Sequence, residues 1–150
     1  MGGKMTLGPD FKEFVRLLNE NEVRYLVVGG YAVAFHGHPR YTKDIDIWIE
    51  ADQANADRAL RVLDEFGFGS VGLTPQDFLE ARRIIQLGRP PNRIDLLTSL
   101  KGVDFEPCHE VRETTEVEGV PVQFIGLDCL KTNKLAVGRH QDLADLENLE

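Results

Sequence analysis

The chain of 150 residues is long enough for one domain with its own core, because 42% of its residues are hydrophobic and 28% are charged. A formal net charge of −8 and the lack of a basic tract argue against a broad, non-specific grip on nucleic acid. No apolar run reaches the roughly 18 residues of a transmembrane helix, and no secretory signal peptide is recognisable, so we expect no membrane association.

The two cysteines, Cys108 and Cys129, form no C-x-x-C motif. We interpret both as buried thiols and not as a disulfide or a zinc pair, which fits a reducing cytoplasm and predicts a cytoplasmic protein. We interpret residues 1–8 as a flexible leader and residues 9–150 as a single domain.

Helical spacing, alternation and breaks at glycine or proline predict the elements of this domain. Asp10 and Glu13 have the spacing of a capping box, and Asp52 and Gly67 have the residue types of a helix N-cap and C-cap. In chain order, we expect a helix over 9–18, a strand over 25–28, a short helix over 31–35, a strand over 43–50, a helix over 53–66, a short helix from 75, strands over 83–87 and 93–98, a loop with at most a helical turn over 100–110, strands over 111–117 and 120–125, and helices over 128–137 and 142–149. This order indicates an α/β domain with a mixed sheet, in which each pair of later strands forms a hairpin.

Two aspartates lie two residues apart on the strand over 43–50. Its alternation places Ile45, Ile47 and Ile49 on one face and Asp44 and Asp46 on the other. The two carboxylates repel each other, and burial of an unpaired carboxylate is costly. A divalent cation between them would remove both problems, because Mg²⁺ binds one or two carboxylates together with phosphate oxygens. The alternative is an amphipathic edge strand with a solvated acidic face.

A third aspartate, Asp95, lies inside the apolar run RIDLL. Aspartate is depleted in strands and is seldom buried without a partner. If this strand lies beside the strand over 43–50, three carboxylates converge. Alternatively, Asp95 pairs with Arg93 or Arg40 at the surface.

The glycine pair Gly29 and Gly30 follows a strand and precedes a helix. Glycine lets the backbone approach a ligand, and the free N–H groups of a helix start can bind phosphate. The alternative is a plain tight turn. The chain has neither the GxGxxG fingerprint of dinucleotide-binding proteins nor a P-loop.

In combination, the motifs VVGG, DIDIWI and RIDLL resemble those of the nucleotidyltransferase superfamily that includes DNA polymerase β and kanamycin nucleotidyltransferase. The pattern of that superfamily is a hydrophobic strand, G-[GS], a spacer, D-x-[DE] between hydrophobic residues, and a separate aspartate later. The resemblance covers about residues 25–149 and implies an α/β (α+β) nucleotidyltransferase fold, with a mixed β-sheet flanked by helices. The tail KTNKLAVGRHQDLADLENL resembles small bacterial AbiEii-type toxins and MNT-type antitoxins. Gly30 departs from the frequent serine, so only backbone N–H groups remain for the triphosphate there.

The resemblance implies metal-dependent transfer of NMP from an NTP to an acceptor hydroxyl. Asp44 and Asp46 would hold two Mg²⁺ ions, with Mn²⁺ as an alternative, and Asp95 would share one ion and take the proton of the acceptor. The residues expected to bind the nucleotide are Gly29, Gly30, Arg40, Lys43, Lys131 and Lys134.

The acceptor is left open among a protein side chain, an RNA end such as that of tRNA, and a small molecule. Because 150 residues leave little room beyond the minimal fold, we expect a partner protein or a second copy to complete substrate recognition. The alternative function is an antitoxin or regulatory binding protein of the same fold that acts through a partner, with weak or no catalysis. Trp48 is expected to pack in the core or at its rim, with stacking on a base as the alternative, and Arg139, Asp142 and Asp145 are expected to form local ion pairs at a capped helix start.

Overall fold

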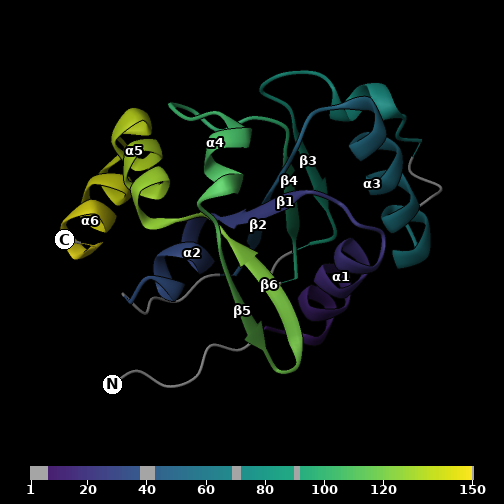
Figure 1. Ribbon diagram of the computed structural model, residues 1–150, viewed down its shortest axis with the longest axis horizontal. Coiled ribbons are helices and arrows are strands. Elements are labelled where there is room, and N and C mark those ends of the chain that lie inside the picture. Colours follow the sequence, from purple (N-terminus) through teal and green to yellow (C-terminus); the bar gives the residue numbers. More distant parts are fainter. Residues whose placement is uncertain (1–6, 38–42, 69–71, 90–91, 150) are drawn as a thin grey trace.

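The computed structural model describes residues 7–37, 43–68, 72–89 and 92–149. Strands and helices alternate along most of this length (Figure 1). In chain order the elements are α1 (Pro9–Glu20), β1 (Tyr25–Val28), α2 (Gly29–Phe35), β2 (Ile45–Ile49), α3 (Gln53–Phe66), the 3₁₀ helix η2 (Pro75–Phe78), β3 (Ile84–Leu87), β4 (Ile94–Leu97), α4 (Phe105–Glu110), β5 (Glu113–Val117), β6 (Val120–Phe124), α5 (Leu127–Val137) and α6 (His140–Leu149).

The strands form one mixed sheet with the order β3-β4-β2-β1-β6-β5. At its centre, β2 runs antiparallel to β1 and parallel to β4, and β1 runs parallel to β6. The two outer pairs, β3 with β4 and β5 with β6, are antiparallel hairpins. The expected mixed sheet and both expected hairpins are therefore confirmed.

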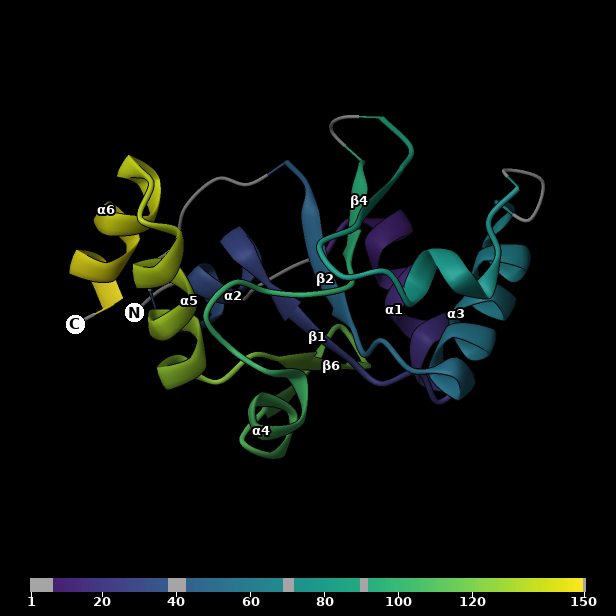
Figure 2. The ribbon, with the colours of Figure 1, turned by 90° about the horizontal axis from the view of Figure 1, so that it is seen from above.

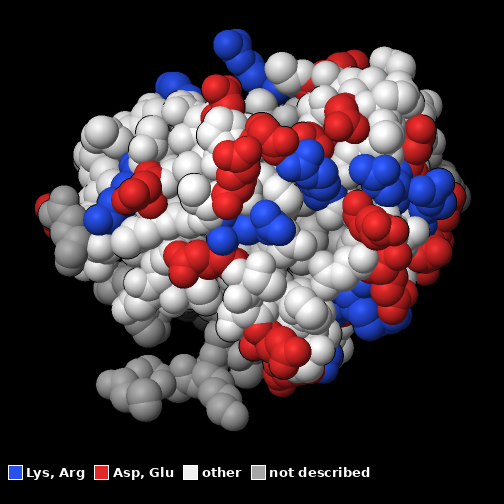
Figure 3. Space-filling view, viewed as in Figure 1, with Lys and Arg blue, Asp and Glu red and all other residues white. Residues whose placement is uncertain are grey.

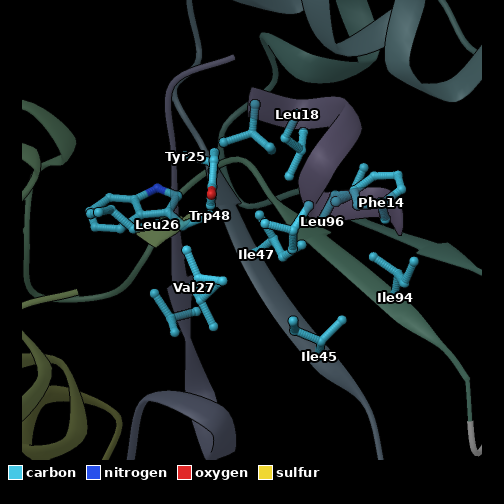
Figure 4. Packing of buried hydrophobic residues seen from close by; sticks show 14 of the residues in the cluster. Phe14, Leu18, Tyr25, Leu26, Val27, Ile45, Ile47, Trp48, Ile94 and Leu96 are labelled. Carbon is cyan, nitrogen blue, oxygen red and sulfur yellow. The ribbon is translucent and has the colours of Figure 1, made fainter. Parts of the chain in front are cut away.

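The sheet has helices on both faces. Helices α1 and α3 lie together on one side, and α5 and α6 stand on the other (Figures 1 and 2). Ile45 and Ile47 of β2 point toward α1, whereas Trp48 points to the opposite side (Figure 4). Trp48 is 2% exposed and meets the ring of Phe105 in α4 edge-on, with ring centroids 5.1 Å apart. The core position expected for Trp48 is confirmed, and the alternation leaves Asp44 and Asp46 on the face of α4 and α5.

Local signals explain most helix ends, but the start of α1 differs from the expectation. Gly8 is the N-cap and Pro9 the first helical residue, so Asp10 lies inside the helix and forms no capping box. The carboxylate of Glu13 binds Arg16 instead. Leu7 is 6% exposed and belongs to the core, whereas residues 1–6 of the expected leader lie outside the described residues. The leader and the domain bounds stay predictions.

The interpretation of the cysteines as free thiols is wrong. Cys108 in α4 and Cys129 in α5 form a disulfide, and their Cα atoms lie 6.0 Å apart although the residues are 21 positions apart in sequence. The expectation failed because α4 was taken for a loop, so nothing in the sequence placed it beside α5. The cytoplasmic location loses its support from free thiols and stays a prediction. Along the described part of the chain, no helix has the length and apolarity that a bilayer crossing requires.

Candidate active site

The register between two central strands brings the predicted carboxylates together. Strands β2 and β4 are parallel neighbours, and Asp46 lies directly opposite Asp95. Neighbouring strands are about 4.8 Å apart, so the two side chains share one face at close range. Asp44 directly precedes β2 and shares that face by alternation. The condition for three converging carboxylates, that the strand of Asp95 lies beside the strand of Asp46, is confirmed.

The surroundings of Asp46 disfavour the ionised form of its carboxyl group. Burial raises its pKa from 3.8 to about 6, and the neighbouring charges of Asp95 and Asp44 act in the same direction. A hydrogen bond between the carboxyl groups of Asp46 and Asp95 adds to the rise, because it needs one of the two protonated. The positive charge of Lys134 opposes the shift without cancelling it. A group of carboxylates that holds a proton this strongly is one that an added cation would stabilise.

Arg93 binds two of the three carboxylates. Its Nη2 donates to Oδ2 of Asp44 at 2.8 Å and to Oδ2 of Asp95 at 3.3 Å. Its Nε lies 3.0 Å from Oδ1 of Asp95, although that oxygen accepts no hydrogen bond. The ion pair of Asp95 with Arg93, which the sequence offered as the alternative to convergence, thus coexists with convergence. Arg40, the other expected partner, lies outside the described residues.

The glycine turn closes on the same site. Helix α2 begins at Gly29, two residues earlier than expected, directly after β1. Gly29 has φ of +64°, a left-handed conformation that favours glycine. A Cβ there would overlap Oδ2 of Asp46, so the carboxylate packs directly on the backbone of Gly29. Gly30 is buried behind it.

Helices α5 and α6 bring a buried ion cluster toward the carboxylates. Lys134 is 4% exposed, and its Nζ lies 3.1 Å from Asp142 and 3.0 Å from Asp145. Nε of Arg139 donates to Asp142 at 2.7 Å, which confirms that part of the expected local pairing, whereas Asp145 pairs with Lys134 of α5. The charge of Asp46 contributes to raising the pKa of Arg139, after the larger effect of Asp142, so the cluster and the carboxylates act on each other.

The sequence did not reveal that Lys134 is enclosed by the two aspartates of α6. The only available signal was the spacing of one lysine and two aspartates in the tail, which fixes no contact by itself. Two other candidates are nearer the surface: Lys43 is exposed beside Asp44, and Lys131 is partly exposed one turn before Lys134. The nucleotide-binding roles of these residues stay predictions.

The donor set suits a hard cation, but it is not assembled around one. Within 7–37, 43–68, 72–89 and 92–149, no three His, Cys, Asp or Glu side chains already stand as a metal-binding group. Asp44 and Asp95 turn to Arg93 instead. Joint ligation by all three aspartates therefore requires some of their side chains to move.

Comparisons with known proteins agree with this architecture. The family model of aminoglycoside-2''-adenylyltransferase matches residues 10–149. Among solved structures, the chain resembles TM1012 of Thermotoga maritima, assigned as a nucleotidyltransferase, with a TM-score of 0.63 and 17% identity over 97% of this chain and 94% of that one. It also resembles the lincosamide antibiotic adenylyltransferase LnuA, in a lincomycin-bound structure, with a TM-score of 0.54 and 15% identity over 96% of each chain.

A third similar structure is an antigenic nucleotidyltransferase-like protein of Paracoccidioides brasiliensis, with a TM-score of 0.55 and 20% identity over 97% of this chain and 78% of that one. A search of curated proteins found no match. At such identities the solved structures show the fold alone, and the relationship to the AbiEii and MNT branches stays a prediction. The chain has the mixed α/β nucleotidyltransferase fold, and it belongs to the aminoglycoside-2''-adenylyltransferase family.

Proposed function

We propose that the chain is a metal-dependent nucleotidyltransferase that moves the NMP of an NTP, with ATP as the first candidate, to a hydroxyl group of a small-molecule acceptor. The observation that carries the proposal is the strand register that sets Asp46 against Asp95, with the carboxylate of Asp46 seated on the backbone of Gly29. A strand, a glycine turn and paired aspartates thus meet at one place.

The carboxylates fit a divalent cation. Asp44, Asp46 and Asp95 offer hard oxygen atoms, and the buried Oδ1 of Asp95 has an ion-pair contact with Arg93 at 3.0 Å but accepts no hydrogen bond. Burial, followed by the neighbouring carboxylates, raises the pKa of Asp46, so a bound cation would stabilise its ionised form. We propose two Mg²⁺ ions here, with Mn²⁺ as an alternative; when bound, they would neutralise phosphate charge and polarise the reacting oxygens.

The reaction is a displacement at the α-phosphorus of the nucleotide. The acceptor oxygen forms a bond to this phosphorus, the bond between the α-phosphorus and its bridging oxygen breaks, and pyrophosphate leaves. The proton of the acceptor hydroxyl passes to the carboxylate of Asp95. The backbone N–H groups of Gly29 and Gly30 would hold phosphate oxygens, with no serine hydroxyl to assist them.

Positive side chains around the carboxylates would bind the remaining phosphate charge. Lys43, Lys131 and Arg40 are the candidates for direct contact. Lys134 is held by two carboxylates, so we assign it an electrostatic action from inside α5, consistent with its lowering of the pKa of Asp46. Three of these four cations lie in the described part of the chain.

Two observations favour a small acceptor. The matched family is named for aminoglycosides, and LnuA is named for lincosamide antibiotics. The net charge of −8 would attract a cationic acceptor such as an aminoglycoside and repel the backbone of an RNA. On the face shown in Figure 3, basic side chains are interspersed with acidic ones and form no continuous basic patch among the described residues.

Calorimetric titration with ATP, CTP, GTP and UTP in the presence of Mg²⁺ tests the proposal. The wild type should bind at least one nucleotide, and the double variant Asp44→Asn with Asp46→Asn should bind it far more weakly. Asp57→Asn is the matched control, because Asp57 is exposed on α3 and accepts a hydrogen bond from Gln53 of the same helix. If the wild type binds none of the four nucleotides, the enzymatic function is excluded.

The binding-protein alternative, in which an antitoxin or regulator acts through a partner, predicts a different result. Such a protein would form a complex with its partner and would release no pyrophosphate with any acceptor. The expectation that a partner protein or a second copy completes the acceptor site stays a prediction, and sedimentation of the purified chain with and without nucleotide addresses it.

A further inference from the structure

Arg93 occupies a special place in the register of the two central strands. It directly precedes β4, as Asp44 directly precedes β2, and the backbone N–H of Ile45 donates to the carbonyl oxygen of Arg93 at 3.2 Å. Continuing the parallel register sets Arg93 opposite Asp44, two residues before Asp46 stands opposite Asp95. Three carboxylates and one guanidinium therefore lie together on one face of these two strands.

The guanidinium of Arg93 binds the same carboxylate oxygen atoms that a metal would need. Nη2 of Arg93 lies 2.8 Å from Oδ2 of Asp44, and Nε lies 3.0 Å from Oδ1 of Asp95. A cation at the roughly 2.1 Å typical of Mg²⁺ ligation would have to take those oxygens from the guanidinium. It would also meet a fixed positive charge at close range, which repels it.

The hydrogen bonds and ion pairs of the guanidinium reach Asp44 and Asp95. The side chain of Arg93 is 29% exposed, so part of it borders solvent. A long, flexible side chain at the rim of a site can leave it without disturbing the core.

We propose that Arg93 is the internal counter-ion of the carboxylate site: it holds Asp44 and Asp95 in the metal-free chain, withdraws when a metal binds, and so sets the metal affinity. This inference rests on the proposed function, because it assumes that the aspartates are metal ligands. It makes Arg93 a residue that tunes the site and takes no part in bond breaking. The released guanidinium would face the phosphates that arrive with the metal.

Metal affinity without nucleotide provides the test. Mn²⁺ is titrated into the protein, and free Mn²⁺ is followed by its electron paramagnetic resonance signal. Arg93→Gln keeps a polar side chain and removes the charge, so we expect it to bind Mn²⁺ tighter than the wild type by on the order of 10- to 100-fold, since a hydrogen-bonded charge no longer competes. Arg93→Lys should fall between the two, because one ammonium cannot bridge both carboxylates.

Arg83→Gln is the matched control. Arg83 precedes the neighbouring strand β3 and pairs with Asp77 and Glu80, so its removal changes the net charge equally without touching the carboxylate site. Its Mn²⁺ affinity should equal that of the wild type. An equal or weaker affinity of Arg93→Gln, relative to the wild type, overturns the inference. Should Arg93→Gln fail to fold, as judged by circular dichroism, an unchanged affinity of Arg93→Lys overturns it.

The same titration separates this inference from the function on which it rests. If the wild type and Arg93→Gln both bind Mn²⁺ with the same affinity, the role of Arg93 is wrong and the metal site stands. If neither binds Mn²⁺, the metal site itself is wrong, and the role of Arg93 falls with it.

Discussion

Replacing Asp46 by asparagine should stabilise the metal-free protein. Burial and the nearby carboxylates raise the pKa of Asp46 from 3.8 to about 6. Each pKa unit corresponds to about 1.4 kcal/mol, so the ionised side chain lowers the free energy of unfolding by about 3 kcal/mol at neutral pH. Asparagine keeps the shape and removes the charge. Asp46→Asn should therefore be more stable than the wild type by up to about 3 kcal/mol at pH 7.5 without metal.

The pH dependence gives this prediction its sign. Between about pH 4 and 6 the folded chain holds a proton on Asp46 that the unfolded chain has lost, so the stability of the wild type falls as the pH rises through this window. The advantage of Asp46→Asn should be near zero at pH 4, grow to about pH 6 and then stay constant.

Urea unfolding in EDTA between pH 4 and 7.5 measures the effect. Asp57→Asn is the control, and its stability difference should lack this step because Asp57 is exposed. A less stable Asp46→Asn at pH 7.5, or an advantage that does not change with pH, would refute the electrostatic account of the site.

The remaining predictions concern the turn, the ion cluster and the disulfide. Gly29→Ala should lose about 1–2 kcal/mol of stability and, in calorimetric titration, most of its nucleotide affinity, because the φ of Gly29 is +64° and a Cβ there would overlap Asp46. Gly67 also has a positive φ, but the space around its Cβ position is open, so Gly67→Ala should lose stability alone. Lys134→Met should lower the free energy of unfolding by about 3–5 kcal/mol, because Lys134 is the buried cation shared by Asp142 and Asp145, although Asp142 keeps its pair with Arg139. Lys131→Ala should change it by less than about 0.5 kcal/mol. Reduction of the disulfide between α4 and α5, 21 positions apart, should lower the free energy of unfolding by about 3 kcal/mol, and an unchanged urea midpoint in dithiothreitol would contradict this.

Elements that depend on local signals could be predicted from the sequence. The alternation of β2 gave both its faces, and α3 has the expected N-cap at Asp52 and left-handed C-cap at Gly67. The hairpins followed from turn residues between apolar runs. Helix α4 was missed, because its six residues FEPCHE include a proline and have too little length for a helical pattern.

Contacts between residues of different strands or helices could not be predicted from the sequence, because they depend on how these elements pair and pack. That Asp95 meets Asp46 depends on which strand lies beside β2, and no local pattern decides that. The enclosure of Lys134 depends on how α6 folds back on α5, which a spacing in the tail does not fix. Arg93 was considered only as an alternative partner of Asp95, because its bridge to Asp44 exists only once β2 and β4 are paired.

Transfer of labelled nucleotide to an acceptor would establish the proposed reaction. The wild type is incubated with ATP labelled at the α-phosphate, Mg²⁺ and a panel of aminoglycoside and lincosamide antibiotics, and the products are identified by mass spectrometry. We expect an adenylylated acceptor and an equal amount of pyrophosphate, with both lost in EDTA and in Asp95→Asn. A product that forms at the wild-type rate in Asp95→Asn, or in EDTA, would contradict this expectation.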